Sequence, residues 1–268
     1  MAKKEKSLSE QIITETIPAI EAGAVEAAAS LAVQVEKSTD KAKARQKSYV
    51  MDLRIHSPAS LGYLGIEGID TAPALVRLAK VKGLDVIAVT DYNSGTFIDR
   101  IVEAARDTAL TIIPGVVIRC TVGGCDDVIL LCLFPETYTT RKVEDFLRRL
   151  QIPDKAFGNR KHSVKLPFED ILKAVEEFNG VVVPSRMDKT PFRQSVIPLL
   201  VEQYGFRAFD MAYSDSIRYF KTHWPKTKFQ LFSFSNANAL AQVGSRIAKV
   251  KMTIPGFEGI RQIVERQP

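Results

Sequence analysis

The chain has 268 residues, of which 46% are hydrophobic and 25% charged, and this composition excludes a disordered chain, a collagen-like repeat and a disulfide-rich scaffold. Its length is that of one large domain or two small ones, and such a chain buries enough surface to fold without a structural metal. The formal net charge is +6, but residues 49–268 carry 29 of the 37 lysines and arginines and 24 of the 31 acidic residues, so the excess is small and spread out.

Residues 1–48 are predicted to form an N-terminal helical extension that ends in a charged linker, and residues 49–268 the main domain. Pro18 divides the extension into two helices. The second helix carries a narrow, alanine-rich apolar stripe: Ile20, Ala24, Ala27, Leu31 and Val35. Such a stripe packs on the main domain, on a second copy of the chain or on another protein. Residues 8–37 are therefore the predicted site of self-association or of binding to a protein partner.

From Tyr49 onward, strand-like and helix-like stretches alternate with short turns. The predicted strands are Val50–His56, Leu84–Thr90, Thr111–Arg119, Val128–Phe134, Val181–Pro184, Ala208–Ala212, Phe229–Phe232 and Ile247–Met252. The helical patterns cover 71–81, 95–107, 140–150, 167–178, 191–204, 214–220, 237–242 and 256–265. This alternation is typical of a parallel α/β fold, either a barrel or a doubly wound sheet, and the pattern favours the barrel. In both architectures the functional residues lie at the C-terminal ends of the strands.

The three cysteines are predicted to be reduced, buried thiols. Cys120 and Cys125 flank the sequence Thr-Val-Gly-Gly, which predicts a hairpin between the third and fourth strands, and Cys132 follows on the fourth. Their spacing is not that of a zinc ribbon, and the chain has no second cysteine pair.

The ends of the first three strands carry polar motifs. They are Asp52-Leu-Arg-Ile-His56-Ser, Thr90-Asp91-Tyr-Asn93 and Pro114-Gly-Val-Val117. These resemble the Asp-Leu-His-x-His-Ser, Thr-Asp-His-Asn and Pro-Gly-x-Glu motifs of the polymerase and histidinol phosphatase (PHP) family. Three later segments resemble further motifs of that family in the same order: Val128-Ile-Leu-Leu, Val183-Pro-Ser-Arg186-Met-Asp188 and Ser235-Asn236-Ala-Asn238. The resemblance implies a distorted (β/α)7 TIM-like barrel of the PHP type, with a metal cluster at its C-terminal mouth that usually hydrolyses phosphoesters.

Most positions that bind metal in that family hold other residues here. The resemblance places these side chains at ligand positions: Arg54, Tyr92, Val117, Ile129 and Arg186. Valine and isoleucine have no donor atom, and a guanidinium has no lone pair for a cation. Asn236 and Asn238 replace an aspartate and a histidine, and neutral amides do not balance the charge of clustered divalent cations. His56 and Asp91 remain, so we expect no metal cofactor, or at most one weakly held divalent ion.

Arg54 and Arg186 add positive charge where the resemblance places metals. One interpretation is structural: one of the two arginines pairs with Asp91 and stabilises a mouth that has lost its cluster. The other is that they bind a phosphate-like anion, because guanidinium groups match such oxyanions with two parallel hydrogen bonds. The candidate ligand-binding residues are Arg54, His56, Asp91, Arg186, Asn236 and Asn238.

The charge pattern does not favour nucleic acid as a partner. The two densest basic stretches, Lys41–Lys47 and Asn159–His162, are short and contain no aromatic residue. Nucleic-acid binders usually concentrate basic residues on one stripe with aromatic residues between them. No apolar run approaches the ~20 residues that span a bilayer, so we expect a soluble, cytoplasmic protein that does not bind a membrane.

Three functions remain open at this point. The first is a non-catalytic PHP-like protein, a pseudoenzyme that acts as a binding or scaffolding subunit. The second is a divergent metal-dependent phosphoesterase that uses His56 and Asp91. The third is a sensor that binds an anionic metabolite in the barrel mouth. Metal content separates the first from the second, and anion titration separates the first from the third.

Overall fold

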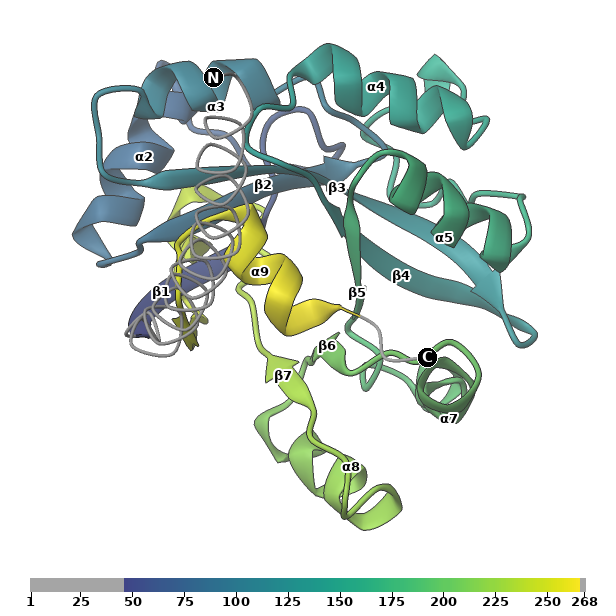
Figure 1. Cartoon of the computed structure of the whole chain (residues 1–268). Coiled ribbons are helices and arrows are strands. Elements are labelled where there is room, and N and C mark those ends of the chain that lie inside the picture. The colour runs from purple at the N-terminus through teal and green to yellow at the C-terminus, as the bar shows by residue number, and fades with distance from the viewer. Residues whose placement is uncertain (1–45, 266–268) are drawn as a thin grey trace, which may run out of the picture. The chain divides into compact units, whose positions relative to one another are not determined.

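A computed structural model describes residues 46–265, and the helical extension predicted for residues 8–37 lies outside them. The strands form one sheet in the order β7-β6-β5-β4-β3-β2-β1-β8 (Figure 1). In chain order they are β1 (Lys47–Ile55), β2 (Val86–Tyr92), β3 (Thr111–Val122), β4 (Cys125–Leu133), β5 (Val181–Ser185), β6 (Ala208–Asp210), β7 (Gln230–Phe232) and β8 (Ala248–Met252). Each corresponds to a predicted strand.

Helices cover both faces of this sheet. They are α2 (Thr71–Val81), α3 (Ile98–Ala105), α4 (Thr140–Arg149), α5 (Phe168–Glu177), α6 (Pro191–Gln194), α7 (Ile197–Glu202), α8 (Ile217–His223) and α9 (Phe257–Val264). Short 3₁₀ turns occupy Asp154–Ala156, Ser214–Ser216 and Leu240–Gln242. Helices α2 to α5 lie on one face of the sheet and α9 on the other (Figure 1). The helix predicted over 191–204 is two helices, and the one predicted over 237–242 is a single 3₁₀ turn.

The sheet curves into a nearly closed barrel because β1 has two partners along one edge. Its first half pairs antiparallel with β8, from Lys47 opposite Met252 to Met51 opposite Ala248. Its last residue, Ile55, forms a parallel bridge with Ala237, which follows β7 in the chain. Closure of this kind confirms the predicted TIM-like barrel.

The expectation of a parallel sheet is only partly correct. Strands β1, β2 and β3 run parallel, as do β5, β6 and β7, but β4 is antiparallel to both β3 and β5. The reversal between β3 and β4 is the predicted hairpin. Its two turn residues, Gly123 and Gly124, have φ angles of 53° and 82°, as a tight hairpin turn requires. All three cysteines on this hairpin are free and buried, as expected.

The barrel interior is packed with apolar side chains. Val117 on β3 and Ile129 on β4 are 0% and 4% exposed and belong to one apolar cluster with Leu131 and Phe234. Phe257 of α9 belongs to the same cluster, so this helix fills the barrel from the face opposite α2 to α5. Two of the positions that the resemblance assigns to metal ligands are therefore part of the hydrophobic core.

Within residues 46–265, no helix is long and apolar enough to cross a membrane.

Candidate functional site

Arg54 lies at the end of β1 and is almost fully buried, with 1% of its surface exposed. Its Nη1 donates to Oγ of Ser185 at 2.7 Å and forms an ion pair with Oδ2 of Asp210 at 3.4 Å. Its Nη2 lies 3.5 Å from the hydroxyl of Tyr92. Burial raises the pKa of Asp210, and the positive charge of Arg54 acts in the opposite direction. The guanidinium thus joins the ends of β1, β5 and β6 inside the barrel.

His56 is a neutral, buried imidazole. Its ring stacks on Tyr92 with centroids 4.7 Å apart, and its two nitrogens lie 3.4 Å from Oγ of Ser60 and 3.4 Å from Oδ1 of Asn236. Desolvation, and then the charge of Arg54, lower the pKa of His56 to about 3. The residue therefore carries no charge at neutral pH.

Asp91 accepts its hydrogen bonds from two serines, not from an arginine. The backbone N–H of Ser57 donates to Oδ1 at 2.7 Å, the Ser57 hydroxyl donates to Oδ2 at 2.5 Å, and the Ser60 hydroxyl donates to Oδ1 at 2.6 Å. The prediction that Arg54 or Arg186 pairs with Asp91 is therefore wrong: Arg54 pairs with Asp210, a carboxylate at the end of β6. Burial raises the pKa of Asp91, and the serine donors offset part of that effect.

Arg186 follows the end of β5 at the rim of the mouth, and the residue is half-buried. Its backbone N–H donates to the carbonyl of Asp210 at 2.6 Å, and its own carbonyl accepts from Lys189 and from the guanidinium of Arg193. Among the described residues, its side chain makes no hydrogen bond or ion pair. The backbone is therefore held firmly while the charged group stays free.

Three non-glycine residues with left-handed backbones lie just beyond the ends of β2, β5 and β7. They are Asn93, Arg186 and Asn236, with φ angles of 50°, 57° and 52°. Each belongs to a segment that carries a PHP-like motif. Such a conformation costs an L residue on the order of 1 kcal/mol, and surrounding contacts must hold it. The strand ends thus keep sharp turns although the side chains of the motifs have changed.

Asn238 makes its hydrogen bonds with residues other than His56. Its side-chain amide donates to the carbonyl of Asn236 at 3.2 Å, its backbone N–H donates to Gln242 at 2.7 Å, and its carbonyl accepts from Leu64 at 2.7 Å. The structure thus brings Arg54, His56 and Asn236 close together and places Asn238 in the contacts that hold the loop after β1.

These residues do not fit a PHP-type metal cluster. Both oxygens of Asp91 accept serine hydrogen bonds, and Val117 and Ile129 lie in the apolar core. No group of three or more histidine, cysteine or acidic side chains is placed for a metal within residues 46–265. The cationic guanidinium of Arg54 also lies close enough to lower the pKa of His56, and a divalent cation there would be repelled by the same charge.

Asp210, Ser185 and Ser60 belong to this site but were not predicted as members of it. Asp210 was assigned to the middle of a strand predicted to end at Ala212, whereas β6 ends at Asp210 itself. Because functional residues are expected at the C-terminal ends of strands, a strand predicted to end at Asp210 would have made this carboxylate a candidate site residue. The two serines carried no such signal, because serine is common at strand ends for many reasons.

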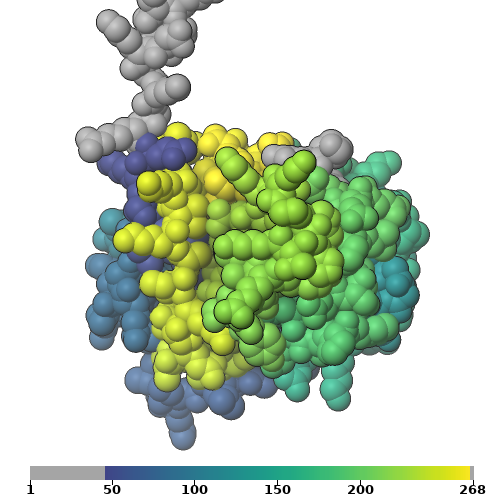
Figure 2. All heavy atoms as spheres, turned by 90° about the horizontal axis from the view of Figure 1, so that it is seen from below, coloured from purple at the N-terminus to yellow at the C-terminus, as the bar shows by residue number. Residues whose placement is uncertain are grey.

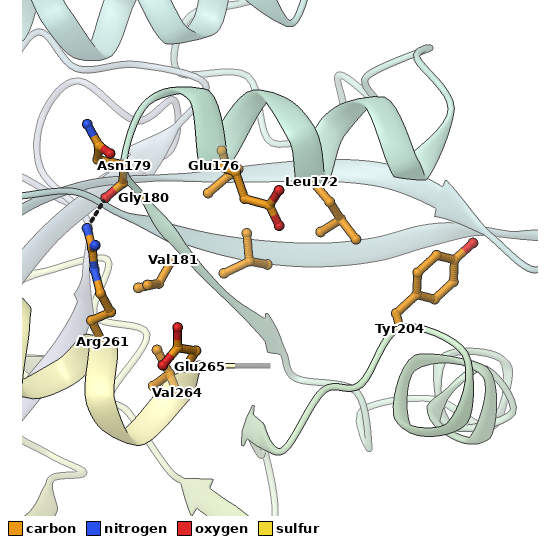
Figure 3. A pocket seen from close by; sticks show the side chains of 11 residues that line it. Leu172, Glu176, Asn179, Gly180, Val181, Tyr204, Arg261, Val264 and Glu265 are labelled. Atoms are coloured by element: carbon orange, nitrogen blue, oxygen red, sulfur yellow. Dashed lines mark hydrogen bonds between the residues drawn. The ribbon is translucent and has the colours of Figure 1, made fainter. Parts of the chain in front are cut away.

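A cavity of about 500 Å³ lies elsewhere, between α5, the start of β5 and α9 (Figure 3). Leu172, Val181 and Val264 line it together with the charged side chains of Glu176 and Arg261. Arg261 donates to the carbonyl of Asn179 at 2.7 Å. The cavity is at the opposite end of β5 from Ser185, so it is separate from the mouth.

Comparison by sequence finds a curated relative that is a DNA polymerase, although no family model matches the chain. Over 144 residues it is 30% identical to error-prone DNA polymerase 2 of Agrobacterium fabrum, and this match covers 54% of the chain and 12% of the polymerase. The chain therefore corresponds to a small part of that protein.

Comparison by structure finds the same fold in nucleases. A lesion-specific endonuclease, endonuclease Q of Pyrococcus furiosus, superposes with a TM-score of 0.59 at 20% identity, over 82% of this chain and 56% of that one. Endonuclease Q bound to a 27-mer duplex with an abasic lesion superposes with a TM-score of 0.57 at 19% identity, over 81% and 56%. The described residues therefore share the fold of these nucleases. An amidohydrolase from Chromobacterium violaceum also has this fold, with a TM-score of 0.52 at 12% identity, over 81% of this chain and 97% of that one.

Proposed function

We propose that this chain is a non-catalytic PHP domain that serves as a binding or scaffolding subunit in the cytoplasm. The observation that supports the proposal is the buried ion pair between Arg54 and Asp210, with Ser185 as a third partner. It fixes a permanent cation inside the mouth, where a metal-dependent phosphoesterase needs ligands with lone pairs. The proposed contact with a protein partner, or with a second copy, lies in residues 8–37.

Metal content and hydrolysis together test this proposal. The full-length chain, purified without chelator, is expected to hold clearly less than one tightly bound transition metal per chain. It is also expected not to hydrolyse bis-p-nitrophenyl phosphate when Mn²⁺, Zn²⁺ or Mg²⁺ is added, while an active PHP phosphoesterase assayed alongside does. Metal-stimulated hydrolysis that disappears in His56→Ala would instead support a divergent phosphoesterase that uses His56 and Asp91.

An anion sensor is the second candidate, and the free guanidinium of Arg186 favours it. Both nearby carboxylates are saturated: Asp210 accepts from Arg54, Ser185 and Phe234, and Asp188 accepts from the backbone of Ala212 and Tyr213. A phosphate-like anion would balance the remaining charge.

The sensor is tested by titration with inorganic phosphate. We expect phosphate to raise the melting temperature of the chain but not of Arg186→Met, whereas the exposed control Arg77→Met should respond like the unmodified chain. An unchanged melting temperature up to 20-fold excess over physiological phosphate would remove this candidate.

A further inference from the structure

The segment from Ile217 to Phe229 concentrates positive charge on one surface of the domain. It contains four basic residues and no acidic one: Arg218, Lys221, Lys226 and Lys228. All four are exposed, and within the described part of the chain none of them forms an ion pair. In the space-filling view the yellow-green stretch that includes α8 stands forward on the face shown (Figure 2). Along the sequence these charges are spaced too widely to stand out as a dense basic stretch.

Aromatic packing holds this segment in place. Phe220, 2% exposed, lies between Phe209 of β6 and Phe229, with ring centroids 5.2 Å and 4.9 Å away. Trp224 packs against Phe229 and donates from its indole N–H to Glu202 at 3.2 Å. The basic side chains therefore extend from a fixed support, which reduces the entropy that they lose when they bind.

The start of the segment is tied to the rim of the mouth. Asp188, in the loop that carries Arg186, accepts hydrogen bonds from the backbone of Ala212 and Tyr213 and from the hydroxyl of Ser216, at 2.6 to 2.7 Å. Lys189 of the same loop lies 5.8 Å from the ring centroid of Tyr213. Lys189 therefore adds one cation close to the segment that precedes α8.

We propose that the surface formed by Arg218, Lys221, Lys226 and Lys228 binds the phosphate backbone of nucleic acid. On a helix, residues three apart have Cβ atoms about 5–6 Å apart, so Arg218 and Lys221 present neighbouring charges. A nucleic-acid strand carries one negative charge per nucleotide, so neighbouring cations can contact successive phosphates. Tyr219 and Trp224 are partly exposed between the basic residues, and partly exposed aromatic rings beside cations are typical of single-strand binding.

Other anionic partners fit this surface less well. A membrane-binding surface inserts a broad apolar face among its basic residues. Here Ile217, 44% exposed, is the single large aliphatic side chain between 217 and 229 that the structure leaves exposed. An acidic protein is anchored mainly by apolar and aromatic side chains that fill pockets, whereas the exposed side chains of this segment are mostly basic or polar. The surface therefore suits a flexible polyanion that is recognised by charge and stacking.

Fluorescence anisotropy with the full-length chain tests the proposal. The probes are a 20-nucleotide single-stranded DNA, the matching duplex and a 20-residue polyglutamate peptide, each at 50 to 200 mM KCl. The test variant is Lys221→Glu/Lys226→Glu. The control variant is Lys249→Glu/Lys251→Glu, which makes the same charge change on exposed positions of β8. Melting temperatures of both variants establish that they are folded.

We expect the unmodified chain to bind single-stranded DNA with an affinity that falls as salt increases. The test variant should bind at least about tenfold more weakly at 100 mM KCl, with a log–log salt slope reduced by about 1 for each phosphate that it no longer binds. The control variant should bind within about twofold of the unmodified chain. Equal weakening in both variants would overturn the proposal, as would absence of binding to both DNA probes at 50 mM KCl. Tighter binding to polyglutamate than to DNA would assign the surface to an acidic protein instead.

Discussion

Replacement of Arg54 by methionine should destabilise the fold strongly, because it leaves Asp210 buried without its cation. The carboxylate of Asp210 is 0% exposed and would keep hydrogen bonds only from Ser185 and the backbone of Phe234. Removal of one partner from a buried ion pair costs about 3–5 kcal/mol. With a urea m-value of about 3 kcal/mol per M, the unfolding midpoint should fall by roughly 1 to 1.7 M.

The stability lost in Arg54→Met should depend on pH, in a direction set by the pKa of Asp210. Burial already raises the pKa of Asp210 in the folded state, and without Arg54 that pKa rises further above its unfolded value. A carboxyl group with a raised folded pKa favours the folded state most at low pH and loses that contribution as pH increases. The difference in unfolding free energy between Arg54→Met and the unmodified chain should therefore be smaller at pH 5 than at pH 8.

Two further variants complete this test. In Arg54→Met/Asp210→Asn the buried charge is absent and the amide oxygen still accepts from Phe234, so most of the lost stability should return. Arg100→Met breaks an ion pair with Asp70 whose side chains are 59% and 53% exposed, and it should cost less than about 1 kcal/mol. If Arg54→Met cost no more than Arg100→Met at pH 8, the role assigned to Arg54 would be wrong.

Further predictions concern two buried carboxylates and the start of the domain. Burial raises the pKa of Asp52 to about 6 from 3.8, so ionisation of this carboxyl group should lower the free energy of unfolding as pH rises from 4 to 7. In urea titrations, Asp52→Asn should reduce this fall in unfolding free energy by roughly 3 kcal/mol. Asp91→Ala should cost about 1–3 kcal/mol in thermal unfolding, since it leaves serine donors unpaired, and Asp91→Asn should cost less, whereas equal losses would contradict the hydrogen-bond assignment. Deletion of residues 1–45 should leave a folded domain with a nearly unchanged melting temperature and abolish partner binding or self-association in sedimentation, whereas deletion of 1–48 should lower the melting temperature because it removes residues of β1 that pair with β8. An intact assembly after the shorter deletion would place the contact elsewhere.

The sequence predicted the strands well because runs of β-branched residues bounded by turn residues are strong local signals. It predicted the hairpin before Cys125 for the same reason. It did not predict that β5 returns antiparallel to β4, because the helices α4 and α5 between them are typical of a parallel crossover. Whether a strand runs parallel or antiparallel to its neighbour depends on packing between segments that are distant in the sequence.

The candidate site was predictable only in part. The positions of Arg54, His56 and Asp91 followed from the motif resemblance, and the structure places all three at strand ends. The partner of Arg54 did not follow, because Asp210 is 156 residues away and no local pattern connects the two. Opposite charge suggested Asp91 as the partner of an arginine, but this carboxylate accepts its hydrogen bonds from Ser57 and Ser60 instead.

The two junctions that close the barrel along β1 differ in how extensively they are hydrogen-bonded. Five residue pairs join its first half to β8, while its far end is joined to the segment after β7 by two backbone hydrogen bonds, from His56 to Ala237 and from Ala237 to Arg54. A junction of so few bonds opens at lower free energy than a full ladder, as local fluctuations do in other domains. Water would then enter beside Arg54, and the amide hydrogens of His56 and Ala237 would exchange with solvent well before those of β2 and β3. The buried ion pair of Arg54 and a sparsely hydrogen-bonded part of the barrel wall are in the same place.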